Sequence, residues 1–389
     1  MKNESFAATL KKNSMLIILV LVYLFFMVLT KGGIFQSSSF TELINQNAYV
    51  YILGVGMLMC MLTGGNIDLS CGAFVCLLGA IGGMFMIVKG MGTGVSILLL
   101  VLIGVLYGVI LGFLIAYVNI PPWIATLAGF LAFRGLGTSI LSNNSTTGSL
   151  APFPVSFQNV FYGRVFPTNK GVFNVPCFTA GLLAAAVITL VIFVNRKNRI
   201  KKGYEADTIR TACLKSVISD AAVLLVMYKL AWDGGIPTTL LWVAGIVLIY
   251  SFITSKTTIG RHFYVVGGNM EAARLSGVNT RRIMFLAYLN MAVLTAIATF
   301  TVVARSQSAY ADVGKNFEMD AISACVVGGV SATGGAGSVL GMVIGATLIG
   351  IINLGMSLIS LDANYQRVVK GFVLLAAVVF DILSQKKER

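Results

Sequence analysis

Long apolar runs separated by short polar segments make up almost the whole chain. A helix needs about 20 mostly apolar residues to cross the hydrocarbon core of a bilayer, and these runs lack the polar–apolar alternation of barrel strands. We therefore expect an all-α integral membrane protein, a polytopic bundle of about 10–12 transmembrane helices in a single domain over residues 1–389. The runs cover about 15–31, 46–64, 70–88, 94–118, 122–142, 175–194, 213–230, 237–254, 283–304, 319–331, 338–360 and 364–383.

One run differs from the others in its length. The run 319–331 is shorter than a full span, and a bilayer crossing needs about 20 residues. We expect a half-helix, a kinked helix or a re-entrant segment there.

The composition supports the membrane assignment and excludes several classes of site. Of the 389 residues 57% are hydrophobic and only 11% are charged, whereas soluble domains carry about 25% charged residues. His262 is the only histidine, which excludes a His-rich metal or catalytic cluster. The cysteines lack metal-like CxxC spacing and are interpreted as small buried residues: Cys60, Cys71, Cys76, Cys177, Cys213 and Cys325.

The basic residues that give the chain its net charge of +14 are unevenly distributed. Cytoplasmic segments of membrane proteins collect Lys and Arg. An even number of spans between the basic segments would place all of them in the cytoplasm, with both termini. The opposite face would then hold 143–174, which has enough aromatic residues to form an ordered surface. The basic segments are the N-terminal end, 195–215, 255–282 and the C-terminal end.

A polar, glycine-rich segment interrupts the apolar pattern at residues 63–72. A carboxylate in the middle of a bilayer costs about 2.5–3.5 kcal/mol on insertion scales. We therefore expect Asp68 near a helix end, in a re-entrant turn or beside a wet cavity. It could cap the helix that begins near Ser70 or line a transport path, and the two roles are compatible.

A second segment, 267–279, predicts a short amphipathic helix on the cytoplasmic side. Leu275 and Val278 are expected on one face, with Glu271 and Arg274 on another. Gly277 is placed to end the helix in the left-handed conformation. A compact surface helix suits docking to a soluble partner, although a plain connecting loop is the alternative.

A third segment, 328–338, has the glycine density of a phosphate-binding loop. It lacks the Lys-Ser/Thr ending that such a loop needs. Close helix packing, or a tight cytoplasmic turn between a short and a full helix, is the favoured interpretation.

These segments resemble elements of ABC-transporter permeases for simple sugars, the ribose and xylose type. TGGNIDLSCGA at 63–73 resembles their "SGIDLSVG" element, and IPPWIATLAGFLAFRGL at 120–136 resembles "PPFIATLGTMxxxRGL". IGRHFYVVGGNMEAARLSGVNTRRI at 259–283 is similar to their cytoplasmic loop, and 318–358 is similar to their "ELDAIAAVVLGG" region. The chain departs from the pattern at Asn66 and Cys71, and in about 40 additional residues, 195–236, that resemble the longer xylose and multiple-monosaccharide subgroup.

The resemblance implies a permease subunit of an ATP-driven importer for monosaccharides, with xylose or a range of aldoses as the cargo. Such a chain is not an enzyme and binds no cofactor, since ATP and Mg are used by a separate subunit with two fused ATPase domains. It implies a permease homodimer in the bacterial inner membrane, an extracytoplasmic sugar-binding protein as partner, and no nucleic acid.

The resemblance also implies where function lies in this sequence. The loop 255–282 would couple to the ATPase through Gly267, Gly268, Asn269, Glu271, Ala272, Ala273, Arg274, Ser276 and Gly277. A path for a neutral sugar would need polar rather than strongly charged residues, so Asn66, Asp68, Ser70 and Asn353 are its candidates.

Purely structural roles remain open for two polar residues in apolar runs. Asn353 could instead form an interhelical hydrogen bond. Arg134 could snorkel or pair, rather than take part in gating.

Other functions remain open. A related permease could carry a nucleoside, a furanosyl signalling molecule or another small polar solute. An ion-coupled secondary transporter would need intramembrane carboxylates, for which Asp68 and Asp220 are the candidates. A membrane enzyme would need a cluster of titratable groups, and none is evident.

Overall fold

The computed structural model describes residues 14–204, 206 and 208–386, and its architecture is helical. Within these residues, nine helices are long and apolar enough to cross a membrane. The expected polytopic helical bundle is therefore confirmed. The nine are α3 (Ser37–Leu62), α4 (Cys71–Gly83) with its π-helical continuation η2 (Met84–Val88), α5 (Thr93–Ala116), α6 (Pro122–Asn144), α8 (Val175–Lys201), α9 (Ile209–Trp232), α10 (Thr238–Lys256), α13 (Thr280–Ser306) and α15 (Val339–Leu358).

The remaining elements complete the two ends and one side of the bundle. The helices are α2 (Ser14–Leu29), η1 (Gly33–Phe35), α7 (Val155–Tyr162), α11 (Thr258–Gly268), α12 (Met270–Leu275), α14 (Phe317–Val327) and α16 (Ala363–Lys386). Two antiparallel strand pairs join β1 (Ser149–Leu150) to β4 (Ala309–Tyr310) and β2 (Arg164–Val165) to β3 (Ile236–Pro237).

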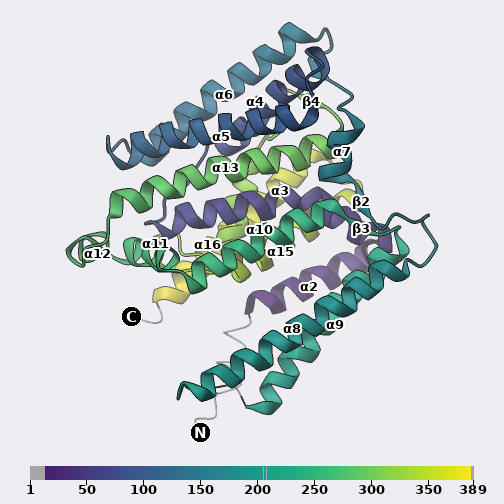
Figure 1. Cartoon of the computed structure of the whole chain (residues 1–389), viewed down its shortest axis with the longest axis vertical. Coiled ribbons are helices and arrows are strands. Elements are labelled where there is room, and N and C mark those ends of the chain that lie inside the picture. Colours follow the sequence, from purple (N-terminus) through teal and green to yellow (C-terminus); the bar gives the residue numbers. More distant parts are fainter. Residues whose placement is uncertain (1–13, 205, 207, 387–389) are drawn as a thin grey trace.

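The long helices run between two distinct ends. Figure 1 shows the strand pairs and α7 together at one end, the strand end, and α12 at the other, the α12 end. The end of α8 with the start of α9, and the segment α11–α12, belong to two of the expected basic segments, and both lie at the α12 end. Lys2, Lys11, Lys12, Lys387 and Arg389, which contribute to the other two, lie outside the described residues.

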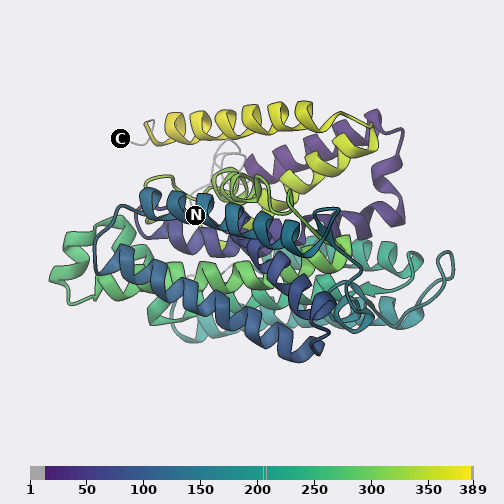
Figure 2. The ribbon, with the colours of Figure 1, turned by 90° about the horizontal axis from the view of Figure 1, so that it is seen from above.

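Helices α3 and α13 form the centre of the molecule. They pack against each other and against α4, α5, α14 and α15. We call α3, α4, α13 and α15 the inner bundle, because most of their side chains are buried. Figure 1 shows α5 and α6 along one edge and the α8–α9 hairpin along the opposite edge, while Figure 2 shows α16 as an outer layer.

The segment 143–174 forms the ordered surface that its aromatic residues predict. Phe153, Phe157 and Phe161 are each at most 2% exposed and pack under the strand end. The additional residues 195–236 supply the end of α8, the basic turn and α9, so they complete a helical hairpin. Five of the six cysteines are buried as expected, but Cys213 on this hairpin is exposed.

Helix α14 is the short segment that the sequence predicts near 319–331, and it begins halfway along the bundle. The ring of Phe317 at its start stacks on Tyr49 in the middle of α3, with centroids 3.6 Å apart. The chain therefore turns inward from β4 through 311–316 before the helix starts. The glycine-rich segment 328–338 that follows is the tight turn to α15, as expected.

Candidate functional site

Helices α4 and α14 begin against each other inside the bundle. A side chain at Gly72 would meet the carbonyl oxygen of Gly314 at 2.3 Å and Oε2 of Glu318 at 2.1 Å. Only glycine permits such a close approach of two backbones. The two helix starts thus form a single packed junction, with Glu318 only 4% exposed.

Asp68 and Ser70 form the turn that leads into this junction. Oδ1 of Asp68 accepts hydrogen bonds from the backbone N–H of Ser70, at 2.8 Å, and from its hydroxyl, at 2.5 Å. The Ser70 hydroxyl also bonds that of Tyr107 on α5, at 2.6 Å. Asp68 and Ser70 are each at most 1% exposed. In this conformation they stabilise the turn before α4 and do not line an open surface.

The other two path candidates lie apart from each other. Asn66 donates hydrogen bonds to the carbonyl oxygen of Thr63, at 3.1 Å, and to Sδ of Met284 on α13, at 3.3 Å. Asn353 lies on the strand-end half of α15, whereas Asn66 follows the α12-end terminus of α3. Oδ1 of Asn353 is buried without a hydrogen bond among the described residues.

Two acids that were not considered as intramembrane groups lie inside the bundle. Restricting such carboxylates to Asp68 and Asp220 was wrong, because α14 begins halfway and carries Glu318 and Asp320 to that depth. Asp320 is 4% exposed. The sequence signal for this site was the pair of acids, Glu318 and Asp320, at the start of a short apolar run.

Asp320 joins three helices. Its Oδ2 accepts a hydrogen bond from the Tyr49 hydroxyl of α3, at 2.6 Å. Nζ of Lys370 on α16 lies 2.9 Å from its Oδ1 and 3.0 Å from its Oδ2. Asp220, by comparison, accepts hydrogen bonds only from the hydroxyls of Thr189, at 2.5 Å, and Ser216, at 3.1 Å, among the contacts described.

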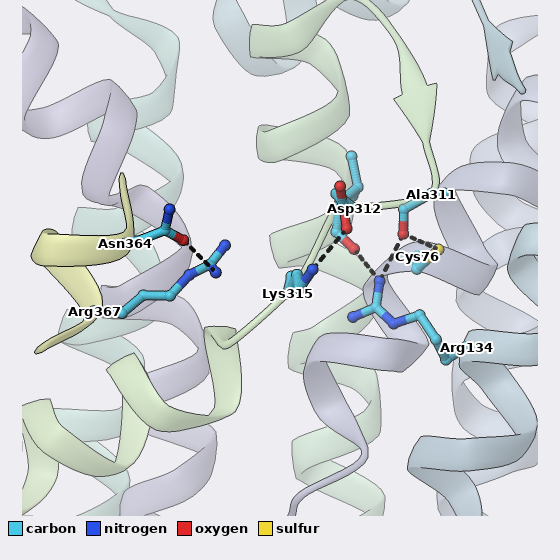
Figure 3. A network of polar contacts seen from close by, with 8 residues as sticks. Cys76, Arg134, Ala311, Asp312, Lys315, Asn364 and Arg367 are labelled. Carbon is cyan, nitrogen blue, oxygen red and sulfur yellow. Dashed lines mark hydrogen bonds and ion pairs between the residues drawn. The ribbon is translucent and has the colours of Figure 1, made fainter. Parts of the chain in front are cut away.

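Arg134 holds the turn before α14 in place. Its guanidinium donates to the carbonyl oxygens of Ala311, at 2.9 Å, and Val313, at 2.8 Å. Figure 3 shows this contact on one side of the turn, with the Lys315–Asp312 ion pair beside it. The expectation that Arg134 pairs is confirmed.

The segment α11–α12 projects at the α12 end. Asn269 caps α12 by accepting the N–H of Ala272 at 2.9 Å, and Gly277 ends it with φ +81°, as expected. Leu275 and Val278 do not share a face: Leu275 is 84% exposed, whereas Val278 packs against the core. The reason is that α12 ends at Leu275 and Gly277 redirects the chain.

The predicted coupling residues divide into exposed and buried ones. Glu271 and Arg274 form an exposed ion pair at 3.3 Å. Ala273 is fully buried inside its own chain, so it does not offer a docking surface in this conformation. The exposed members are Gly268, Asn269, Glu271, Ala272, Arg274, Ser276 and Gly277.

Gly267 packs this projecting segment onto two other unusual segments. A side chain at Gly267 would lie 1.7 Å from the carbonyl oxygen of Leu62, at the end of α3, and 2.6 Å from the backbone nitrogen of Gly335. Gly335 itself donates to Leu62 at 3.2 Å. The segments 63–72, 267–279 and 328–338 therefore meet at the α12 end, although the first is far from the other two in the sequence.

The described residues contain no group of three or more His, Cys, Asp or Glu side chains that could hold a metal ion. The arrangement contains instead an exposed short helix, a close-packed connection to the inner bundle, and a buried polar junction.

Residues 39–378 match the family described as branched-chain amino acid transport system, permease component. The chain belongs to this family of transport permeases. It is 34% identical over 377 residues to the xylose transport system permease protein of Haemophilus influenzae, covering 96% of both chains.

Other relatives extend the same pattern. The xylose transport system permease protein of Escherichia coli is 31% identical over 96% of this chain and 92% of its own. The ribose import permease protein of Bacillus subtilis is 32% identical over 87% of this chain and 83% of its own. No solved structure matches this chain.

Proposed function

We propose that this chain is the permease subunit of an ATP-driven importer that carries monosaccharides, xylose first among them, across the bacterial cell membrane. Its relatives are named as xylose transport and ribose import permeases, which supports a monosaccharide as the cargo. The single observation that supports coupling is the exposed helix α12, packed through Gly267 onto the end of α3 and the 328–338 turn.

In this proposal α12 docks on a separate ATPase subunit with two fused domains. ATP-driven closure of that subunit displaces α12. Because Gly267 leaves no space between α11 and Leu62, the displacement passes to α3 and to the turn that follows α14. Both lead to the junction of α4 and α14, whose rearrangement would open the path. The permease itself binds no nucleotide, and ATP and Mg stay with its partner.

The orientation follows from charge. The basic segments at the α12 end face the cytoplasm by the positive-inside rule, together with both termini. The strand end then receives sugar from an extracytoplasmic binding protein. Two copies of the chain form the complete permease, as the family resemblance implies.

Reconstitution tests the function directly. The chain, its ATPase partner and its binding protein in proteoliposomes should take up labelled D-xylose only when ATP is present. Uptake driven by a proton gradient without ATP would replace the proposal with ion-coupled transport.

Glu271→Lys tests the docking assignment. We expect weaker co-purification with the ATPase subunit and reduced uptake, with normal membrane insertion, because the change reverses an exposed charge on α12. Lys89→Glu, an equal-sized charge change at an exposed position of the strand end, is the matched control and should leave assembly unaltered. Unchanged transport by Glu271→Lys would remove α12 as the docking element.

A further inference from the structure

A groove lined by both apolar and polar side chains lies between α3, α14 and α16, away from the residues that the sequence nominates for the path. Its volume is about 470 Å³, within the range of about 300–1,000 Å³ typical of small-molecule sites. Its walls include Tyr49 of α3, Phe317 and Asp320 of α14, and Gln366, Lys370 and Leu374 of α16.

We propose that this groove is a contact site for a neutral monosaccharide during its passage, an inference that rests on the proposed function. The residues offer the two kinds of surface that a sugar needs. Tyr49 and Phe317 form a stacked aromatic pair, which suits the apolar face of a sugar ring. Asp320, Lys370 and Gln366 supply acceptors and donors for its hydroxyls.

The charges of the groove favour a neutral ligand over an anion. Lys370 is paired with Asp320, and Lys315 at the rim is paired with Asp312 at 3.1 Å. The guanidinium of Arg367 donates to the side chain of Asn364 at 3.3 Å, at the α16 side of Figure 3. Both lysines are thus paired with carboxylates, and a phosphate would have to displace a carboxylate to bind either of them.

The depth of the groove in the bundle fits a site that a solute contacts on its way across the membrane. Phe317 lies at mid-length of α3, so the groove lies at mid-depth, where an ionisable side chain is costly. Placing Asp320 and Lys370 at this depth costs free energy. Apolar side chains could hold α14 and α16 together without that cost. Two of its walls are α14, which begins at the junction with α4, and α16, which forms an outer layer in Figure 2.

Site-directed labelling in the complete importer tests the inference. Met319 lines the groove and is 45% exposed, so Met319→Cys should react with a water-soluble thiol reagent, followed by peptide mass spectrometry. D-Xylose at a saturating concentration should slow this reaction about ten-fold, because protection follows the occupied fraction. D-Xylose 5-phosphate and sucrose should protect much less.

A native cysteine and a second variant keep the result interpretable. Cys213 on α9, exposed and outside the groove, should react at the same rate with and without sugar. If Met319→Cys does not assemble, Leu374→Cys reports from the opposite wall.

The outcomes separate the two proposals. A wild-type complex that transports xylose with ATP, combined with labelling that no monosaccharide slows, overturns the groove assignment and leaves the permease function intact. Stronger protection by the sugar phosphate overturns the neutral-ligand assignment. A wild-type complex that transports none of the sugars tested overturns the proposed function, and the groove assignment with it.

Discussion

Helix α3 and helix α8 both qualify as membrane spans, yet they occupy opposite situations in the protein. In the most apolar window of α3, 67% of the residues are buried and the mean hydropathy is 1.3; for α8 the values are 17% and 2.6. The less apolar helix is the more deeply buried one. In lipid, helices associate by packing and polar contacts rather than by hydrophobicity, so the most apolar surface is left for the acyl chains.

The largest expected difference separates Asp320 of α14, a buried acid on a helix that packs against the inner bundle, from Asp220 of the α8–α9 hairpin, which is partly exposed. Asp320→Asn leaves the ammonium of Lys370 without its anion, and breaking a buried pair costs about 3–5 kcal/mol. Asp220→Asn on the hairpin keeps hydroxyl partners and should cost far less. Thermal unfolding of the purified permease in detergent measures both. Equal losses would show that the two acids have the same role.

Leucines of the two regions give the next contrast. Leu58 in α3 is fully buried, and Leu→Ala in a packed core costs about 2–5 kcal/mol. Leu183 in α8 is 69% exposed, so Leu183→Ala should leave the unfolding temperature nearly unchanged. A clear loss at Leu183 would mean that the hairpin face packs against protein, such as a second copy, and the same measurement in a cross-linked dimer would reveal it.

Adjacent glycines test the connection of α11 to the inner bundle. Gly267→Val places atoms on the Leu62 carbonyl and should cost at least the 1–3 kcal/mol, roughly, of an overpacked site, with transport largely lost. Gly268→Ala enters open space and should retain the stability of the purified permease. Equal behaviour of the two variants would contradict the close packing at Gly267.

The smallest expected effect on stability comes from Asp233, where the α8–α9 hairpin attaches to the strand end. Burial alone would raise the pKa of Asp233, but the hydrogen bond and charge of Arg164 and the charge of Lys170 lower it below its ordinary value of 3.8. A lowered pKa stabilises the fold above the unfolded-state value, and this contribution disappears as the pH falls through the folded-state value.

The pH dependence gives this prediction its measurement. Asp233→Asn should be less stable than the wild type at neutral pH, and the difference should shrink only below about pH 4. Unfolding curves at several pH values measure it. A difference that persists unchanged in acid would show that the contact is not ionic.

Much of the coupling segment could be predicted from the sequence because its signals are local. Gly277 as a stop and the turn at 328–338 depend on residues a few positions apart. The face of Leu275 was predicted wrongly, because helical periodicity was extended past the point where α12 ends. Glu318 and Asp320 were missed because the depth at which α14 begins depends on Tyr49, which is 271 positions before Asp320 in the sequence.

The sequence by itself determined that the chain is a bundle of membrane helices, where most of these helices lie, and where glycine and charge interrupt them. These properties depend on each segment alone, since the transfer of a helix into lipid sums over its own residues. Only the tertiary structure decided which helices are buried and that Leu62, Gly267 and Gly335 meet. It also brought Tyr49, Asp320 and Lys370 together. Such contacts depend on the fit between distant segments of similar hydropathy, which no local pattern records.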